Sequence, residues 1–457
     1  MNKRNKGGWF NRLDISIIVL VIVGIVFTGC QSADKNEETG GDILLLNDDA
    51  SWCWYQDERA MLDGDQLLFS AVTSEGANTV SSYNIATGEQ QTVVLNDTTF
   101  QPDDHNVGVL LKRPDGRYLT VYAGHGVDTK MWYRISSSPG DISEWGPEQT
   151  ADTREEVTYS NVYRLSDNGK VYNFHRGIGW NPNYMVSEDE GESWRYGGQL
   201  LAHPGRPYLR YTSNNSDQIH FIATEGHPRN YNNSIYHGYT DGKQVYGSGG
   251  QAVGPLSGEE STDLKPYDFT TVFDGDSTTR ANVAWTSDIE LDGEGRPYVA
   301  FSVTKDPIAL GEREQTEKAG FDHRYHYARW DGEQWQEHEI AYAGSRLYPG
   351  ENEYTGLITL HPDDPDVVYI SADVDPATGE ELNPEGPRRY EIFRGTTGDR
   401  GASWEWTPIT EDSDQDNIRP VVVSNDRYEA VLWLNGRYST YTDYDLDVLG
   451  IISERED

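Results

Sequence analysis

The sequence predicts an all-β protein built as one domain, a seven-bladed β-propeller of four-stranded antiparallel blades. Three observations lead to this fold class. The chain of 457 residues contains 46 Gly and 20 Pro, which favours many short strands over long helices. A pattern of apolar strand, polar turn and second strand recurs along the chain. No interval between these hairpins keeps a helical period, which argues against alternating strands and helices.

Seven hairpins are recognised by their apolar second strands, whose starts lie roughly 50 to 80 residues apart. The strands are QLLFSAV (66–72), RYLTVYA (117–123), KVYNFHR (170–176), QIHFIAT (218–224), RPYVAFS (296–302), DVVYISA (366–372) and YEAVLWL (428–434). Each interval accommodates one four-stranded sheet with its loops. Short, protected edges favour a propeller, and the spacing also permits six or eight blades. We expect the ring to close where the C-terminal strands pack against the first blade.

Two turns share the pattern S/T-x-D-x-G-x-x-W. They are SEDEGESW at 187–194 and TGDRGASW at 397–404. This pattern resembles the Asp-box turn of sialidase-like propellers. The Asp and Gly are expected to shape a hairpin and the Trp to pack between blades, with no catalytic role.

The N-terminal segment is interpreted as a targeting signal. Residues 1–29 combine a basic start, an apolar core and FTGC, which resembles a bacterial lipoprotein signal peptide with cleavage before Cys30 and lipidation of its thiol. Phe27 departs from the usual small aliphatic residue, so a plain membrane anchor is the alternative. Residues 30–47 are polar and acidic and predict a flexible tether, with the propeller at 48–457. The mature protein is expected at the bacterial outer membrane or cell surface, lipid-anchored.

Charge and cysteine content narrow the partners. The formal charge of −39 disfavours a nucleic-acid partner, because phosphate binding needs a basic face. An anionic ligand would need a local cationic pocket that works against this global field. Cys30 and Cys53 are the two cysteines, so no disulfide framework is expected. We expect a monomer.

One hairpin carries a histidine at each outer end. In DDHNVGVLLKRPDGRYLTVYAGH, His105 and His125 lie ten residues on either side of Asp115 in the turn. Antiparallel pairing brings the two ends of a hairpin together, so both imidazoles are expected at the same rim, the end of the ring away from the turns. A single histidine at a strand end is more often structural than catalytic.

The next two hairpins add polar groups to the same rim. They supply Tyr159, Asn161, His175, Arg176, Arg206, Tyr208, Tyr211, Glu225, His227 and Arg229. Imidazole, phenol and guanidinium groups suit β-elimination on a uronic acid. An arginine neutralises the substrate carboxylate, and a Tyr and a His move the protons, with base and acid left open. Arg176 is expected to lower the pKa of Tyr159. A glycosidase would need two carboxylates, and Glu225 is the clearest one here.

The motifs DDHN, YAGH, TYSN, YNFHRG, RPYLRYTSN, EGHPR and NSIYHGY resemble the BNR-repeat propellers that include ulvan lyases of polysaccharide lyase families twenty-four and twenty-five. The resemblance implies a seven-bladed enzyme that cleaves ulvan, a sulfated algal polymer of rhamnose 3-sulfate and uronic acid, into unsaturated uronyl oligosaccharides. Matched by motif, the catalytic residues are His105, His125, Tyr159 and Arg176. Substrate contacts are expected from Asn106, Asn161, His175, Arg206, Tyr211 and Arg229.

The resemblance also implies a structural metal, often zinc, for which His227 and His237 are the nearest match, although no cysteine follows in their neighbourhood. Calcium in the acidic runs 361–366 and 411–417 is the weaker interpretation. The chemistry itself needs no cofactor. Two alternatives stay open, a non-catalytic surface propeller that binds acidic glycans and a glycoside hydrolase of the same fold.

Overall fold

The computed structural model describes residues 41–97, 100–275, 282–307 and 319–455. The predicted signal peptide, the predicted lipidation site Cys30 and most of the predicted tether lie outside the described residues. No helix within the described ranges is long and apolar enough to cross a membrane.

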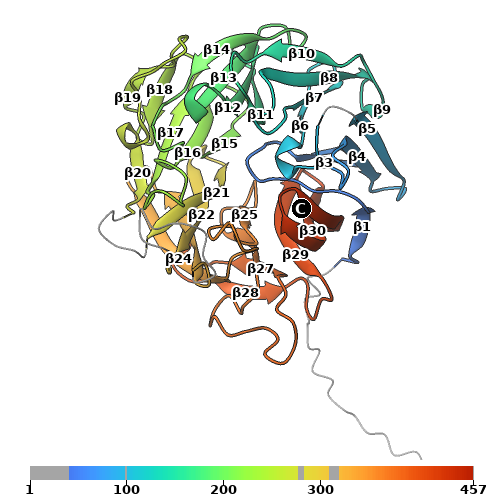
Figure 1. The fold of residues 1–457 in the computed structure, drawn as a ribbon, viewed down its shortest axis with the longest axis vertical. Coiled ribbons are helices and arrows are strands. Elements are labelled where there is room, and N and C mark those ends of the chain that lie inside the picture. Colours follow the sequence, from blue (N-terminus) through green and yellow to red (C-terminus); the bar gives the residue numbers. More distant parts are fainter. Residues whose placement is uncertain (1–40, 98–99, 276–281, 308–318, 456–457) are drawn as a thin grey trace, which may run out of the picture. The chain divides into compact units, whose positions relative to one another are not determined.

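Seven antiparallel sheets follow one another around a ring in the unit that runs from Gly40 to Asp457 (Figure 1). Five of them have four strands, while the second and fourth blades carry additional strands at their outer sides. The first strands of neighbouring blades lie against one another, so these strands surround the axis. The predicted seven-bladed propeller is confirmed.

The strands are given from the axis outward. Blades 1 and 2 consist of β2 (Ala60–Asp63), β3 (Gln66–Val72), β4 (Asn78–Asn84) and β5 (Gln90–Asn96), and of β6 (Val109–Lys112), β7 (Tyr118–Tyr122), β8 (Lys130–Ser138) and β10 (Gln149–Asp152), with β9 (Asp141–Trp145) beside β8. Blades 3 and 4 consist of β11 (Thr158–Leu165), β12 (Lys170–Arg176), β13 (Pro182–Ser187) and β14 (Arg195–Gln199), and of β15 (Leu209–Ser213), β16 (Ile219–Ala223), β17 (Ile235–Thr240), β18 (Gln244–Gly247) and β19 (Ala252–Pro255), with β20 (Thr270–Phe273) beside β17.

Blade 5 consists of β21 (Val283–Leu291), β22 (Pro297–Thr304), β23 (His323–Trp330) and β24 (Trp335–Gly344). Blade 6 consists of β25 (Ile358–Leu360), β26 (Val367–Ala372), β27 (Glu391–Thr396) and β28 (Glu405–Pro408). Blade 7 consists of β29 (Asp416–Ser424), β30 (Tyr428–Thr440), β31 (Asp443–Glu454) and β1 (Leu44–Asn47). The described 3-10 helices are η1 (Asp104–Asn106), η2 (Ile178–Trp180) and η3 (Pro266–Asp268).

The predicted second strands are the second strands of the seven blades, β3, β7, β12, β16, β22, β26 and β30. In the hairpin that carries His105 and His125 at its outer ends, Lys112 pairs with Tyr118, so the turn is centred on Asp115 as predicted. Alternating apolar residues of each strand fill the spaces between blades, which form separate apolar clusters.

The ring closes with a strand from the beginning of the described chain. β1 pairs with β31 and completes blade 7, while β29 of that blade lies against β2 of blade 1, as expected for the C-terminal strands. The predicted boundary at residue 48 is therefore wrong, because β1 lies within the segment predicted as a tether. The short apolar run of β1 buries Leu46 in the core. The sequence prediction missed this strand because the segment as a whole is polar and acidic.

Both Asp-box turns form as predicted. In the first, Ser187 Oγ donates to Asp189 Oδ1 at 2.8 Å, and the Gly191 N–H donates to Ser187 Oγ at 2.8 Å. The second turn repeats these bonds from Thr397. Trp194 lies 6.3 Å from Tyr133 of blade 2, between ring centroids, so the tryptophan packs between blades.

A segment at residues 52–57 crosses the axis and plugs the ring. The Trp52 indole donates to the Arg419 carbonyl of blade 7, and the Trp54 indole donates to the Thr286 carbonyl of blade 5, both at 3.2 Å. The Asp57 carbonyl accepts from Val162 of blade 3 at 3.0 Å. This aromatic plug separates the rim from the turn side of the ring.

Candidate active site

The two predicted histidines meet at the rim. Their rings are stacked, with centroids 4.1 Å apart and planes inclined by 14°. Asp103 lies between them: Nδ1 of His105 is 2.8 Å from Asp103 Oδ1, and Nδ1 of His125 is 2.9 Å from Asp103 Oδ2. His105 belongs to η1 rather than to a strand, and its turn begins with the Asp103 cap. One carboxylate therefore orients both imidazoles.

Tyr159 reaches the rim through a break in strand register. Thr158 pairs with Arg176 and Asn161 with Phe174, so β11 has one residue more than β12 over this stretch. Such a β-bulge turns a side chain in a new direction. Tyr159 takes a left-handed backbone conformation with φ 71°, which is uncommon outside glycine. Its ring lies 5.7 Å from that of His105, between centroids.

Arg176 is held over the tyrosine by bonds and by stacking. Its Nη1 donates to the hydroxyls of Tyr159 at 3.4 Å and Tyr208 at 3.3 Å, and its Nη2 donates to Thr158 Oγ1 at 3.1 Å. The guanidinium carbon lies 4.8 Å above the Tyr159 ring. Arg176 lines a cavity of about 290 Å³ that opens between blades 2 and 3. The fold thus places a fixed cation beside a phenol and two imidazoles.

The two histidines have opposite electrostatic surroundings. Burial and the neighbouring His105 lower the pKa of His125 to about 4, against the opposing effect of Asp103. Burial also acts to lower the pKa of His105, but Cys53, Asp103 and Asp104 outweigh it and raise the pKa well above its usual value. At neutral pH His125 is therefore neutral and able to accept a proton, while His105 is charged.

Burial raises the pKa of Tyr159 well above its usual value, and the lowering effect of Arg176 does not offset it. Arg176 lowers the pKa of Tyr159, as expected. The expected net decrease in this pKa is wrong, because Tyr159 is only 7 % exposed and burial has the larger effect. Tyr159 is a protonated phenol at neutral pH, which favours the role of proton donor.

Three predicted substrate contacts serve the scaffold behind the rim. Asn106 Oδ1 accepts the His125 backbone N–H at 2.8 Å, which fixes the second histidine. Asn161 Nδ2 donates to the Tyr55 and Phe174 carbonyls at 3.1 and 3.2 Å. His175 is 2 % exposed, and burial lowers its pKa to about 4. These three side chains are buried, so the structure supports positioning roles for them.

The fourth blade supplies Arg206 and Arg229, which line a second cavity of about 620 Å³ at the rim. Tyr211 does not reach this cavity. Its ring stacks on Phe174 at 4.9 Å in the core between blades 3 and 4, and it lines a small pocket that Tyr159 and Arg176 also border, so its substrate contact stays a prediction. Strand alternation explains this, since Tyr211 shares a face with Leu209, which lies in the same core.

Four further residues belong to the site. Tyr208 binds both Arg176 and Arg206 through its hydroxyl. Tyr441 contacts both histidine rings edge-on, at 5.0 and 5.7 Å between centroids. Asp103 and Trp180 complete the set. The motif DDHN contained a signal for Asp103, whereas Tyr441 comes from the last blade and no local pattern connects it to the histidines.

The predicted metal pair is not brought together. His227 packs against Tyr208 and Trp285 at the rim, whereas His237 lies inside blade 4, where its Nε2 is 3.1 Å from His220 Nδ1. His237 is in the third strand of the blade and His227 in the loop after the second, so their side chains serve different layers. No group of three metal-ligating residues among the described ones contains either histidine.

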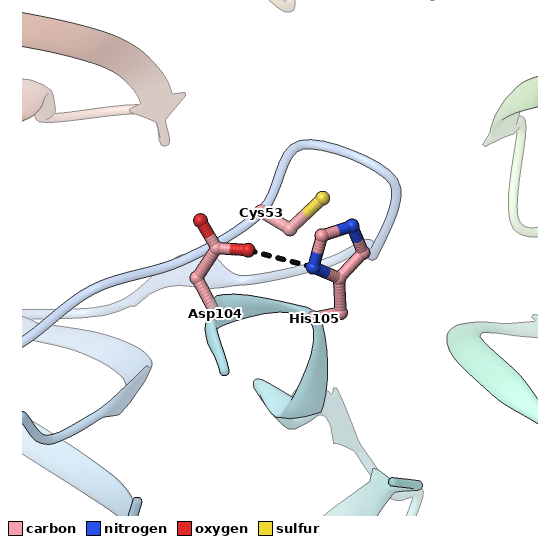
Figure 2. A group of neighbouring side chains, drawn as sticks. All are labelled: Cys53, Asp104 and His105. Carbon is pink, nitrogen blue, oxygen red and sulfur yellow. Dashed lines mark ion pairs between the residues drawn. The ribbon is translucent and has the colours of Figure 1, made fainter. Parts of the chain in front are cut away.

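Two other groups have metal-ligating atoms within 4.8 Å of one another, namely Asp103, His105 and His125, and Cys53, Asp104 and His105. Figure 2 shows the second group, with the ion pair between Asp104 and His105. Its thiol, carboxylate and imidazole suit zinc. Arg419 and the Tyr438 hydroxyl already bind Asp104 Oδ2, so the charge of this carboxylate is balanced by side chains. A structural zinc stays a prediction.

The fold and the repeated Asp-box turns define a β-propeller with BNR-type repeats. The chain belongs to the BNR repeat-containing family, whose model matches residues 53–343, and the predicted resemblance to BNR-repeat propellers is confirmed. No curated protein sequence matches the chain.

Two solved structures of lyases share the fold. A polysaccharide lyase of family PL25, an ulvan lyase bound to -[GlcA(1-4)Rha3S]-, aligns with a TM-score of 0.64 and 15 % identity over 88 % of this chain and 94 % of that chain. The polysaccharide lyase Uly1 aligns with a TM-score of 0.52 and 12 % identity over 87 % of this chain and 90 % of that chain. At 15 % and 12 % identity, these likenesses show a shared fold alone.

Proposed function

We propose that this protein is a polysaccharide lyase that cleaves ulvan, a sulfated polymer of rhamnose and uronic acid, by β-elimination at the uronic acid. The observation that carries the proposal is one cluster at the rim: a fixed guanidinium, a protonated phenol and a neutral imidazole, from Arg176, Tyr159 and His125. The solved ulvan lyase of the same fold was bound to a glucuronate-containing oligosaccharide, which supports this substrate class.

Arg176 acts on the carboxylate of the substrate. A guanidinium paired with the uronate carboxylate neutralises it and stabilises the negative charge that develops when the adjacent carbon loses its proton. Stacking on Tyr159 and the bond to Thr158 hold the guanidinium in place before the substrate arrives, so little reorganisation is needed.

Two groups move the protons. His125 accepts the proton from the carbon next to the carboxylate, and the electron pair forms a double bond to the neighbouring ring carbon as its bond to the glycosidic oxygen breaks. Tyr159 donates its proton to that leaving oxygen. The incoming carboxylate adds negative charge near His125 and raises the pKa of the imidazole, which strengthens it as a base. His105, stacked on His125 and charged, stabilises the phenolate that remains.

For the hydrolase alternative, Asp103 and Glu225 are bonded within the protein, while Glu155 and Glu156 line the cavity of about 290 Å³ beside Arg176. Asp103 holds both histidines, and Glu225, the clearest carboxylate in the sequence, accepts from the Ser234 backbone N–H and the Tyr236 hydroxyl, both at 2.8 Å. Both groups are engaged in the scaffold. A glycosidase needs a free acid and a free nucleophile or base on opposite sides of the scissile bond.

The test is incubation of the protein with ulvan, followed by ultraviolet absorbance of the unsaturated uronate and by the size of the polymer. We expect absorbance to rise as the polymer shortens. Shortening without absorbance would indicate a hydrolase. Retention on immobilised ulvan with neither change would indicate the binding propeller, and either result would overturn the lyase.

A further inference from the structure

Trp180 is an exposed aromatic side chain that the lyase chemistry does not use. It is 48 % exposed at the rim, in the loop after β12. Trp180 and Gly179 both take left-handed backbone conformations, with φ 61° and 66°. For a bulky residue this conformation is strained, and such strain concentrates at functional sites.

The loop is anchored on both sides of the tryptophan. The Trp180 backbone N–H donates to the Gly177 carbonyl at 2.8 Å, and Asn181 Nδ2 donates to the Gly179 carbonyl at 3.1 Å. Gln199 Nε2 donates to the Ile178 carbonyl at 3.0 Å. These bonds fix the backbone, so the indole is presented at the surface by a defined structure.

Two guanidinium groups lie over the indole. Their carbons are 4.9 Å from the ring centroid for Arg176 and 5.0 Å for Arg206. Cation–π attraction of this kind fixes both cations relative to the ring and to each other. Tyr208 accepts hydrogen bonds from both arginines, which ties the three side chains into one unit.

Trp180 also borders two cavities. One, of about 290 Å³, is lined by Arg176 and Thr158 and also by Glu155 and Glu156, and the other, of about 620 Å³, is lined by Arg206, His227 and Arg229. The indole lines both and forms the ridge between them. Volumes in this range hold small ligands or single sugar units. No carboxylate is among the described residues that line the larger cavity.

We infer that Trp180 is a specificity-determining platform on which a sugar ring of the polymer stacks, and that the Arg206–Arg229 cavity beyond it binds an anionic group on the neighbouring sugar. The inference rests on the proposed lyase function. The apolar face of a sugar ring packs on a flat indole, while Arg176 holds the carboxylate at the reacting sugar. The site thus reads two successive anionic groups across one ridge. The second anion is a sulfate or a carboxylate.

Substitutions of Arg229 and of its ion-pair partner are expected to affect KM differently. It forms an ion pair with Glu351. If Arg229 binds the substrate anion, Arg229→Gln raises KM about tenfold with kcat little changed, whereas Glu351→Gln frees the arginine and lowers KM or leaves it unchanged. If the ion pair only stabilises the loop, both substitutions raise KM. That shared direction, or an unchanged KM in Arg229→Gln, would overturn the inference.

Parallel assays on native and chemically desulfated ulvan identify the anion. If Arg229→Gln raises KM only on the native polymer, the bound anion is a sulfate. If it raises KM equally on both polymers, the bound anion is a carboxylate. Trp180→Ala is expected to raise KM at least tenfold on both polymers, and Trp180→Phe to restore most of the affinity. Equal KM values for Trp180→Ala and the wild type would overturn the role of Trp180 as a stacking platform.

Binding is measured separately by titration calorimetry with ulvan oligosaccharides. A protein that binds but does not cleave would overturn the lyase and leave this inference standing if Trp180→Ala and Arg229→Gln weaken binding. A protein that cleaves, with variants of unchanged affinity, would overturn this inference and leave the lyase standing.

Discussion

The rim and the turn side of the ring are built from opposite ends of the same seven inner strands, and they handle charge differently. The larger rim cavity contains Arg206, Arg229 and His227. The turn side opens into a cavity of about 890 Å³ lined by four carboxylates and three cations, namely Glu58, Glu290, Asp292, Asp363, Lys112, Arg113 and Arg164. The sign of charge is thus set by the side chains at the strand ends and not by the fold.

Carboxylates at the two ends are stabilised by different means. At the rim, Asp103 bonds to two histidines and its pKa falls far below the usual range, because His105 and His125 outweigh the effect of burial. On the turn side, burial and Asp57 raise the pKa of Glu58 to about 8. Arg210 pairs with Asp57 and Asp288 but leaves Glu58 to neutralise by protonation. Histidine pairing thus keeps Asp103 charged, whereas burial leaves Glu58 protonated at neutral pH.

The largest expected effect is loss of the proton-transfer groups. Tyr159→Phe and His125→Ala should each lower kcat by about 100-fold or more, because general acid–base catalysis contributes 100- to 10,000-fold. The measurement is the initial rate of ultraviolet absorbance on ulvan. Tyr118→Phe removes a phenol on the turn side, bound to Asp63, and should keep the wild-type rate. Full activity in both rim variants would contradict the site.

A smaller effect is expected from Arg176→Lys. Lysine keeps the charge but loses the flat guanidinium that stacks on Tyr159 and Trp180 and binds Thr158. We expect kcat/KM to fall about 10- to 100-fold. Arg164→Lys is the matched control, since Arg164 forms a bidentate pair with Glu190 on the turn side. Equal losses in the two variants would mean that the rim has no special need for arginine.

The pH profile should place the proton acceptor. His125 acts when it is neutral, and its pKa is lowered to about 4, so kcat/KM should stay high as the pH falls to 5 and decline only near pH 4. Below that value each pH unit lowers kcat/KM about tenfold. Rates measured from pH 3.5 to 8 on prefolded protein test this. A decline centred near the usual histidine value of about 6.5 would remove His125 from the role of base.

The smallest effect concerns the turn side and leaves activity unchanged. A carboxyl whose pKa is raised by folding stabilises the fold below its unfolded pKa and loses that contribution as the pH rises toward 8. Glu58→Gln should therefore raise Tm by about 1–2 °C at pH 9 and hardly at all at pH 4. Scanning calorimetry at both pH values tests this, with the exposed Glu333→Gln as control. An equal gain at both values would contradict the protonation of Glu58.

Local patterns predicted most of the fold and several residues that the structure brings together at the candidate site. The turn at Asp115 determines the register that joins His105 and His125, and the spacing of the second strands indicates the blades. Strand alternation then fails where the chain leaves regular geometry. The bulge at Tyr159 could not be read from the sequence, because it depends on the pairing of β11 with β12. Tyr441 is beyond any local pattern, since ring closure brings it to the histidines.

The closing strand has a consequence for how the protein is made. β1 is synthesised early but pairs with β31, about 400 residues later, so the seam forms only after blade 7 has left the ribosome. The plug joins the same seam, because Trp52 bonds to Arg419 and Arg419 to Asp104, next to His105. A nascent chain that lacks the last blade has neither Tyr441 nor Arg419 beside the histidines. The arrangement of side chains around the two histidines therefore depends on closure of the ring by blade 7.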